Sequence, residues 1–230
     1  MKNLVVLSGA GVSAESGIKT FRDSGGLWEG HDVMEVASPE GWAKDRDLVL
    51  NFYNERRKNA LAATPNDGHK IIAELEQYFN VTVITQNIDN LHEKAGSSKV
   101  LHLHGELFKS RSTLDPNLIY DIDGWELKVG DICEKGSQLR PHIVWFGEMV
   151  PMMDAAVEET LAADIFIVIG TSLQVYPAAG LLEYVKGSSP KFIIDPNMPH
   201  VHPRPNLVLI EEGGSNGMRK VKKLLLESYQ

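Results

Sequence analysis

Residues 3–22 read NLVVLSGAGVSAESGIKTFR. The apolar run at residues 4–7 predicts a buried parallel strand, and the turn after it carries Gly9, Gly11 and Ala14 in the pattern G-x-G-x-x-A. Glycines in such a turn let the backbone approach a pyrophosphate, which the following helix start attracts through its free N–H groups. The order of strand, glycine turn and helix therefore predicts a dinucleotide site. The alternative is an ordinary turn in which glycine serves packing alone.

The loop after this turn differs from that of a hydride-transferring dehydrogenase. In those enzymes the first helix leads to a second strand whose acidic residue binds the ribose. Here residues 20–28 read TFRDSGGLW, a glycine-rich loop that contains the aromatic Phe21 and the cation Arg22. Such a loop beside a dinucleotide site is typical of a mobile cover, and the alternative is a surface connection.

Composition limits the class of protein. The 230 residues are 43% hydrophobic and 23% charged, which is enough for one large α/β domain or for a large and a small one. No apolar run approaches the roughly 20 residues that span a bilayer, and no signal peptide precedes the first strand. We therefore expect a cytoplasmic protein with no membrane partner.

The formal net charge is −8, and one short basic cluster stands near the end of the chain, at Arg219, Lys220, Lys222 and Lys223. The apolar residues between and after these cations follow helical spacing, so the cluster predicts a solvated helix face. We expect no direct binding to nucleic acid. The single cysteine, Cys133, excludes an internal disulfide and any metal site built from several cysteines.

Apolar runs typical of strands alternate with helical patterns along most of the chain, which predicts an α/β fold with a doubly wound parallel sheet. The expected strands are residues 4–7, 81–85, 100–105, 165–169, 191–195 and 207–210; the expected helices are residues 45–63, 69–79, 152–163, 177–186 and 218–229. Ser38 and Pro39 predict the start of another helix, as cap and first helical residue. Residues 106–140 lack strong periodicity and predict a small module.

Polar residues gather where the second strand ends. Residues 86–92 read QNIDNLH, and ligands of open α/β sheets bind at the carboxyl ends of strands. His102 and His104 lie on one side of the next short strand. Tyr53 and Arg56 stand three apart in the predicted helix 45–63 and so share a face of it.

Six motifs occur in the order and approximate spacing of the sirtuins: GAGVS at residues 9–13, TFR at 20–22, TQNID at 85–89, HG at 104–105, FGE at 146–148 and GTSL at 170–173. The chain thus resembles the sirtuin family from its first strand to its last third. The resemblance implies a Rossmann-like, NAD-binding domain at residues 1–30, 65–105 and 146–230. It also implies a smaller inserted domain, made of a helical insertion at residues 31–64 and a counterpart of the family's zinc module at residues 106–145.

The resemblance further implies NAD-dependent removal of acyl groups from lysine side chains of proteins or peptides. NAD is then a co-substrate: nicotinamide leaves the ribose as the acyl oxygen attacks, and O-acyl-ADP-ribose is released. The implied catalytic residues are His104, Asn87 and Asp89. His104 would be the general base, because an imidazole titrates near neutral pH. Without the other motifs it could equally be a core residue, and His102 is interpreted as structural.

The implied cofactor-binding residues come from five segments of the chain. They are Gly9, Ala10, Gly11, Ser13, Glu15, Phe21, Arg22, Gln86, Asn87, Asp89, Gly170, Thr171, Ser172, Asp195 and Ser215. Asp195 is a departure, because sirtuins commonly carry an asparagine there. An aspartate can still accept hydrogen bonds from ribose hydroxyls.

The implied substrate-binding residues are Tyr53, Arg56, Val144, Phe146, Gly147, Glu148 and Val175. The last five match two segments that hold an acyl-lysine peptide as an added strand. Tyr53 and Arg56 resemble the Tyr-x-x-Arg pair of sirtuins that prefer acidic acyl groups, since a guanidinium can pair with a succinyl or malonyl carboxylate. The hypothesis is a desuccinylase or demalonylase with deacetylation as a further activity. The alternative is an exposed pair on a solvated helix face.

The chain departs from the family at the zinc site. Most sirtuins hold a structural zinc with four cysteines, but residues 110–113 read SRST in place of the first pair, and only Cys133 is left for the second. We therefore expect no zinc. The module would then be held by packing of its apolar residues: Leu114, Leu118, Ile119, Tyr120, Ile122, Trp125, Leu127 and Ile132.

Two other functions use the same NAD site. One is ADP-ribosyl transfer to a protein, and the other is a non-catalytic sensor of NAD or ADP-ribose. His104, Asn87 and Asp89 argue against the sensor, because binding alone needs no base. Tyr53 and Arg56 favour deacylation over ADP-ribosyl transfer.

Overall fold

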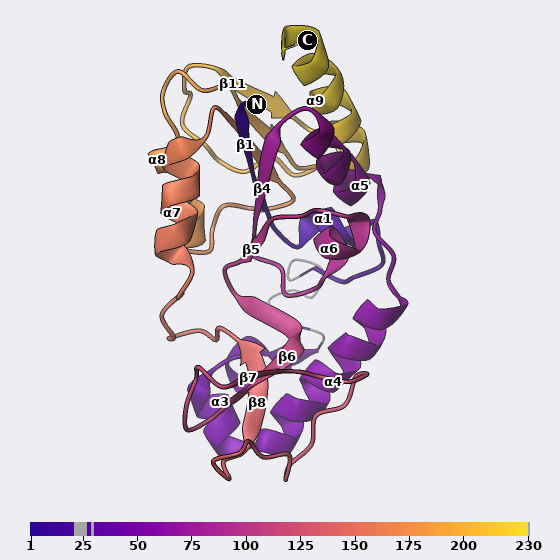
Figure 1. The fold of residues 1–230 in the computed structure, drawn as a ribbon, viewed down its shortest axis with the longest axis vertical. Coiled ribbons are helices and arrows are strands. Elements are labelled where there is room, and N and C mark those ends of the chain that lie inside the picture. Colours follow the sequence, from indigo (N-terminus) through magenta and orange to yellow (C-terminus); the bar gives the residue numbers. More distant parts are fainter. Residues whose placement is uncertain (21–26, 29, 230) are drawn as a thin grey trace.

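A computed structural model describes residues 1–20, 27–28 and 30–229. Figure 1 shows two lobes along the longest axis. The large lobe contains a six-stranded parallel sheet with helices, and the small lobe contains helix α4 and a three-stranded antiparallel sheet. The predicted α/β class and the smaller inserted domain are confirmed. The residue boundaries between the domains stay a prediction, and Phe21 and Arg22 lie outside the described residues.

The large sheet has the strand order β11-β10-β9-β1-β4-β5, and every neighbouring pair is parallel. Its strands are β1 (Asn3–Ser8), β4 (Asn80–Thr85), β5 (Val100–His102), β9 (Ile165–Ile169), β10 (Lys191–Ile194) and β11 (Leu207–Ile210). The first strand of the chain lies in the centre of the sheet, where Leu4 pairs with Val81 on one side and Ile165 on the other. On each side of β1, strands that come later in the sequence lie further from the centre of the sheet. The sheet is therefore doubly wound, as predicted.

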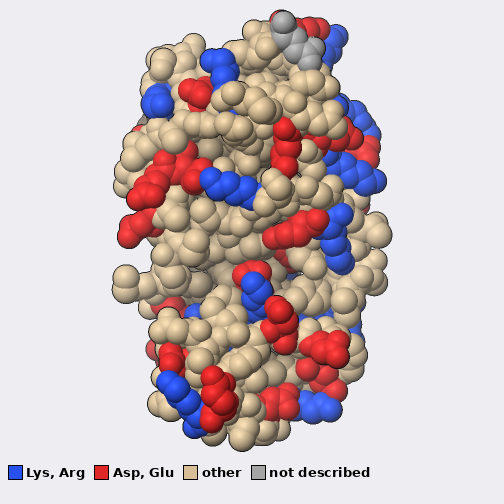
Figure 2. All heavy atoms as spheres, in the orientation of Figure 1, with Lys and Arg blue, Asp and Glu red and all other residues tan. Residues whose placement is uncertain are grey.

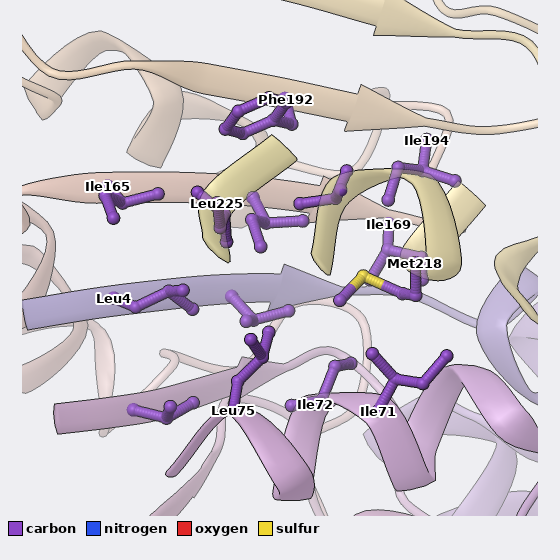
Figure 3. Close-up of a cluster of buried hydrophobic side chains, with 14 of the residues drawn as sticks. Leu4, Ile71, Ile72, Leu75, Ile165, Ile169, Phe192, Ile194, Met218 and Leu225 are labelled. Atoms are coloured by element: carbon purple, nitrogen blue, oxygen red, sulfur yellow. The ribbon is translucent and has the colours of Figure 1, made fainter. Parts of the chain in front are cut away.

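Helices cover both faces of this sheet because successive strand residues point to opposite sides. Leu4 and Val6 pack toward α5 (Asp67–Glu74) and α9 (Gly214–Tyr229), in the cluster drawn in Figure 3. Val5 and Leu7 pack toward α7 (Met153–Ala162) and α8 (Leu181–Tyr184). The near-continuous apolar runs of the central strands are therefore explained by burial on two faces.

Short elements complete the large lobe. They are α1 (Gly11–Ala14), the 3-10 turns η2 (Leu75–Gln77) and η3 (Ala178–Gly180), and α6 (Leu91–Ala95). The helix predicted over residues 177–186 is present as η3 followed directly by α8, which together cover residues 178–184. The closing helix begins at Gly214, four residues before its predicted start.

The small lobe is built from two insertions. The first forms β2 (Leu27–Trp28), β3 (His31–Asp32), α2 (Val33–Val36), α3 (Pro39–Lys44) and α4 (Arg46–Ala62). The predicted cap is confirmed: Ser38 Oγ accepts a hydrogen bond from Gly41 N at 2.9 Å, and Pro39 begins α3. The second insertion forms β6 (Gly105–Ser112), β7 (Ile119–Asp121) and β8 (Leu139–Ile143), three strands that the weak periodicity of residues 106–140 did not predict.

The expectation that apolar packing holds the second insertion is wrong for part of it. Leu127 is buried, but Leu114, Ile119 and Ile132 are 66%, 44% and 59% exposed. Hydrogen bonds take the place of that packing at one end. Ser112 Oγ lies 3.0 Å from Ser137 Oγ, accepts from two backbone N–H groups, and lies 3.3 Å from the Cys133 thiol.

Helix α4 holds the other end of this insertion. Arg57 is fully buried and donates to the carbonyl oxygens of Leu107 at 2.9 Å and Trp125 at 2.8 Å. Asn54 accepts from Leu127 N and donates to Leu127 O, each at 3.0 Å. The two insertions are thus joined by side-chain to backbone hydrogen bonds inside the small lobe.

The surface of the described residues carries both charges in mixture, as Figure 2 shows for one face. Each cation of the basic cluster on α9 has an acidic partner: Arg219 with Asp67, Lys220 with Glu212, Lys222 with Glu74 and Lys223 with Glu227. This pairing agrees with a solvated helix face. Among the described residues, no helix has the length and apolarity needed to cross a membrane. The cytoplasmic location and the absence of nucleic-acid binding stay predictions.

Candidate active site

A cavity of about 1230 Å³ lies between the two lobes. Its walls combine the carboxyl ends of β1, β4, β9 and β10 with α4 and the loop after β8. Pockets for single small ligands measure roughly 300–1,000 Å³, so this cavity has room for a dinucleotide and a second group. All the residues predicted for the site line it except Ser215 and the two outside the described residues.

The glycine turn after β1 packs against the turn after β9. A Cβ atom on Gly9 would lie 2.7 Å from the Gly170 oxygen, and one on Gly170, at φ +64°, would lie 2.2 Å from Val12 N. Glycine is therefore required here for packing between two backbones as well as for a bare cavity wall. Gly9, Gly11 and Gly170 also line the cavity, so these glycines serve packing and leave the cavity wall free of side chains at the same time.

Asn87 and Asp89 form a buried network with Ser13 where β4 ends. The Asn87 amide donates to the Gly9 oxygen and to Ser13 Oγ, both at 3.2 Å. The Ser13 hydroxyl donates to Asp89 Oδ2 at 3.1 Å, and burial raises the pKa of Asp89. These contacts fix the orientation of both side chains before any ligand is present.

His104 has the hydrogen bonding of a general base. Its Nδ1 lies 3.0 Å from the Gln86 carbonyl oxygen, and a carbonyl only accepts, so Nδ1 carries the hydrogen of the neutral ring. Nε2 is then left with a free lone pair on a residue of the cavity wall. Burial lowers the pKa of His104, although the bond to Gln86 opposes this, and the ring is neutral at pH 7.

His102 is engaged at both ring nitrogens, as its structural interpretation requires. Nδ1 lies 3.0 Å from the Asn87 oxygen and Nε2 lies 2.7 Å from Glu93 Oε1. Burial alone would lower the pKa of His102, but Glu93 raises it. His102 does not line the cavity and instead holds the backbone of Asn87.

The remaining predicted cofactor residues come from three parts of the large lobe. Gln86 donates to Thr171 Oγ1 at 3.1 Å, which ties the ends of β4 and β9. Asp195 is buried at the end of β10 and accepts from Asn197 N at 2.8 Å. Glu15 accepts from the backbone N–H of Ser215 at 3.1 Å, so Ser215 is bound to Glu15 and lies off the cavity wall.

Tyr53 and Arg56 both face the cavity from α4. Tyr53 is 0% exposed, which contradicts the alternative of a solvated pair. The Arg56 guanidinium carbon lies 4.2 Å from the centre of the Trp28 ring, a cation–π contact that fixes the long side chain. Burial raises the pKa of Tyr53 well above its usual range, so the phenol keeps its hydrogen.

The predicted substrate segments form the rim on the other side. Phe146 and Val175 are 45% and 40% exposed, as groups that meet a partner from solution must be. Glu148 is instead an anchor: it accepts from Arg140 at 2.7 Å, from Arg111 at 3.1 Å and from Trp145 N at 2.8 Å. Burial alone would raise the pKa of Glu148, but these bonds lower it.

The structure adds residues that the sequence did not single out. Trp28 and Trp145 border Tyr53 and Arg56 in the cavity. His69 is fully buried, and its Nε2 lies 3.4 Å from Ser13 Oγ. His69 is a lone histidine on a helix face, and such a residue gives no functional signal in a sequence. Trp145 stands directly before the FGE motif, and that position is a signal from which its place in the site could have been predicted.

No group of three or more His, Cys, Asp or Glu side chains in the described part of the chain is arranged to hold a metal ion. Absence of zinc stays a prediction. Two residues where the family's zinc ligands are expected, Ser112 and Cys133, bond to each other, and both bond to Ser137.

A doubly wound sheet whose glycine turn and His104 line one cavity is the arrangement of a dinucleotide-binding fold. A model of the Sir2 family matches residues 9–177. A curated NAD-dependent protein deacylase of Bacteroides thetaiotaomicron is 54% identical over 231 residues, covering 98% of this chain and 99% of the relative. The chain belongs to the Sir2 family and is an enzyme of it.

Solved structures agree with this membership. A crystal structure of a Sir2 homologue in complex with NAD has a TM-score of 0.88 and 40% identity, covering 100% of this chain and 91% of that one. A structure of Sir2 bound to an acetylated peptide has a TM-score of 0.81 and 29% identity, covering 96% of this chain and 92% of that one. The resemblance to sirtuins, given above on six motifs, is confirmed.

Proposed function

We propose that the protein removes acyl groups that end in a carboxylate, succinyl and malonyl, from lysine side chains of proteins. NAD is the co-substrate, and nicotinamide and O-acyl-ADP-ribose are the products. The general activity, NAD-dependent protein deacylation, follows from family membership and from the name of the 54% identical relative. The acyl preference is supported by one observation: Tyr53 and Arg56 line the same cavity as His104.

The residues on the cavity wall fit NAD by their chemistry. The bare backbone at Gly9 and Gly11 suits close approach of a pyrophosphate. Thr171 and Ser172 offer hydroxyls, and Asp195 offers a buried carboxylate that can accept from a ribose. Bound there, NAD supplies a ribose carbon from which nicotinamide departs as a leaving group.

The chain's own groups then hold charge and move a proton. His104 Nε2, unprotonated at neutral pH, takes a proton from a ribose hydroxyl. Hydrogen bonds to Ser13 and Gly9 hold Asp89 and Asn87 in place. The Asn87 amide dipole and the Asp89 charge therefore face the reacting groups without reorganising during the reaction. The apolar walls near Ile88 and Val144 keep the site poor in water.

The acyl-lysine peptide enters between the loop after β8 and the segment at Val175. Backbone groups of these two segments are suited to pair with an extended peptide. A structure of Sir2 bound to an acetylated peptide supports this class of partner. At the end of the acyl chain, the Arg56 guanidinium and the Tyr53 hydroxyl meet the carboxylate as two donors.

The experiment compares succinyl-, malonyl- and acetyl-lysine versions of one peptide with NAD, following peptide mass and nicotinamide release. We expect kcat/KM for the acidic acyl groups to exceed that for acetyl. Arg56→Met should lower the succinyl value about 10- to 100-fold, as loss of a charge-assisted hydrogen bond predicts.

Arg46→Met is the matched control, because Arg46 is an exposed arginine on the same helix. An equal loss in both variants, or acetyl removal faster than succinyl removal in the wild type, contradicts the acyl preference. Mass gain on a protein without deacylation of any peptide would establish ADP-ribosyl transfer instead.

A further inference from the structure

Tyr53 and Trp145 are joined by a buried hydrogen bond between the two insertions of the small lobe. The indole Nε1 of Trp145 donates to the Tyr53 hydroxyl oxygen at 3.1 Å. Tyr53 is 0% exposed and Trp145 is 2% exposed, so water does not compete for this bond. Both residues line the cavity close to Arg56.

The direction of this bond fixes the role of the Tyr53 hydroxyl. An indole N–H only donates, so the Tyr53 oxygen must be the acceptor. The one hydrogen of the phenol then points away from Trp145. In the described ranges, Trp145 is the sole hydrogen-bond partner of the Tyr53 hydroxyl, and burial keeps the phenol protonated. That hydrogen is available to a ligand in the cavity.

Trp145 is itself held on several sides. The Arg140 guanidinium carbon lies 3.3 Å from the centre of a Trp145 ring, and the Trp42 ring centre lies 5.8 Å away. Glu148 accepts from the Trp145 backbone N–H at 2.8 Å and from Arg140 at 2.7 Å. The indole is therefore locked by packing and by an ion pair, and it cannot rotate to release Tyr53 without breaking them.

We propose that Trp145 is a positioning residue for acyl selectivity, which directs the Tyr53 hydroxyl hydrogen toward the carboxylate of a bound succinyl or malonyl group. This inference rests on the function proposed above. A carboxylate only accepts hydrogen bonds, so a phenol whose oxygen is already engaged is pre-oriented as a donor to it. An acetyl group has no acceptor at that place, and the orientation of Tyr53 gives it no advantage.

A purely structural role for Trp145 makes a different prediction. If the indole only fills space, its replacement affects all acyl groups alike. If it orients Tyr53, the loss falls on acidic acyl groups and depends on the presence of the Tyr53 hydroxyl. Because the acyl carboxylate lies away from the bond that breaks, the loss also falls on KM and not on kcat.

The test uses Trp145→Phe, Tyr53→Phe and the double variant, with Trp125→Phe as the control for loss of an indole that belongs to the small lobe and lies outside the cavity lining. Affinities of succinyl- and acetyl-lysine peptides are measured by calorimetry, and kcat and KM are measured with NAD. We expect Trp145→Phe to lower the succinyl-to-acetyl ratio of kcat/KM about fivefold, through KM. In the Tyr53→Phe background the same substitution should leave that ratio unchanged.

Two failures are distinguishable. If the wild type shows no preference for succinyl, or Tyr53→Phe leaves the ratio unchanged, the proposed function falls and this inference falls with it. If Tyr53→Phe lowers the ratio but Trp145→Phe behaves like Trp125→Phe, the positioning role alone is overturned. Should Trp145→Phe fail to fold, benzothienylalanine at position 145 replaces the N–H by sulfur in a ring of the same shape, and the same outcomes apply.

Discussion

Four buried or half-buried histidines near the cavity show how one residue type is given different chemistry. Within the described residues, the His104 ring has one hydrogen-bond partner, at Nδ1, whereas the His102 ring is bound at both nitrogens. His69 and His92 are fully buried against each other, with ring centres 4.9 Å apart. Residue type and strand position alone leave His102 and His104 equivalent in the sequence. The HG motif separates them, and the carbonyl of Gln86 gives the physical reason.

His104→Asn should lower the rate at which deacylated peptide forms about 10²- to 10⁴-fold, the range associated with loss of a general base. NAD affinity, measured by calorimetry, should remain, because the amide still reaches the Gln86 carbonyl. Burial lowers the pKa of His104, so the acidic limb of the wild-type rate profile should lie below pH 6.5. A variant within tenfold of the wild type, or an acidic limb above pH 6.5, would contradict the role of base.

Helix α4 is the element that joins substrate recognition to the small lobe. Tyr53 and Arg56 line the cavity, and Asn54 and Arg57, which follow them in the sequence, bond to the second insertion. The helical spacing of apolar residues predicted this helix to within a residue at each end. They did not predict the role of Arg57, because a charged residue beside Arg56 suggests a solvated face. Its partners are backbone carbonyls of a segment without periodicity, and no sequence pattern marks them.

Arg57→Met should lower the free energy of unfolding by about 2–4 kcal/mol, because it leaves buried carbonyls of Leu107 and Trp125 without donors. Arg46→Met, on the exposed side of the same helix, should change it by less than about 0.5 kcal/mol. Urea unfolding of both variants measures the difference. Equal midpoints for the two would show that Arg57 does not hold the insertions together.

The whole molecule is organised around one sheet that sequence pattern describes well. Apolar runs buried on both faces stand out from their surroundings, and the six strands were predicted by such runs. The packing around the cavity was not predicted, because it depends on single contacts: Gly9 with Gly170 within the large lobe, and Trp145 with Tyr53 within the small lobe. The burial of His69 and His92 was not predicted either. Its consequence is a change in the stability of the whole fold with pH.

Stability should therefore fall in mild acid. An unfolded histidine binds a proton near pH 6.5, but burial lowers the pKa of His69 to about 4, so below pH 6.5 protons favour the unfolded chain. This contribution is fully present above pH 6.5 and is lost as pH falls toward 4. For His69 alone the loss between pH 7 and pH 5 is about 2 kcal/mol, and burial lowers the pKa of His92 in the same direction.

Denaturant unfolding of wild type and His69→Gln at pH 7 and pH 5 tests this. The wild type should lose more stability over that interval than the variant, whose side chain does not titrate. The same pH dependence in both proteins would mean that His69 is not the responsible group.

The backbone crosses between the sheets directly beside His104. β5 ends at His102, β6 begins at Gly105, and the returning chain donates from Val144 N to the His104 oxygen at 2.9 Å. A backbone hydrogen bond thus joins two crossings of the chain at His104, the residue proposed as the base. The His104 ring is bonded to the end of β4 and its backbone is bonded to the returning chain, so the position of the imidazole is set by both lobes together.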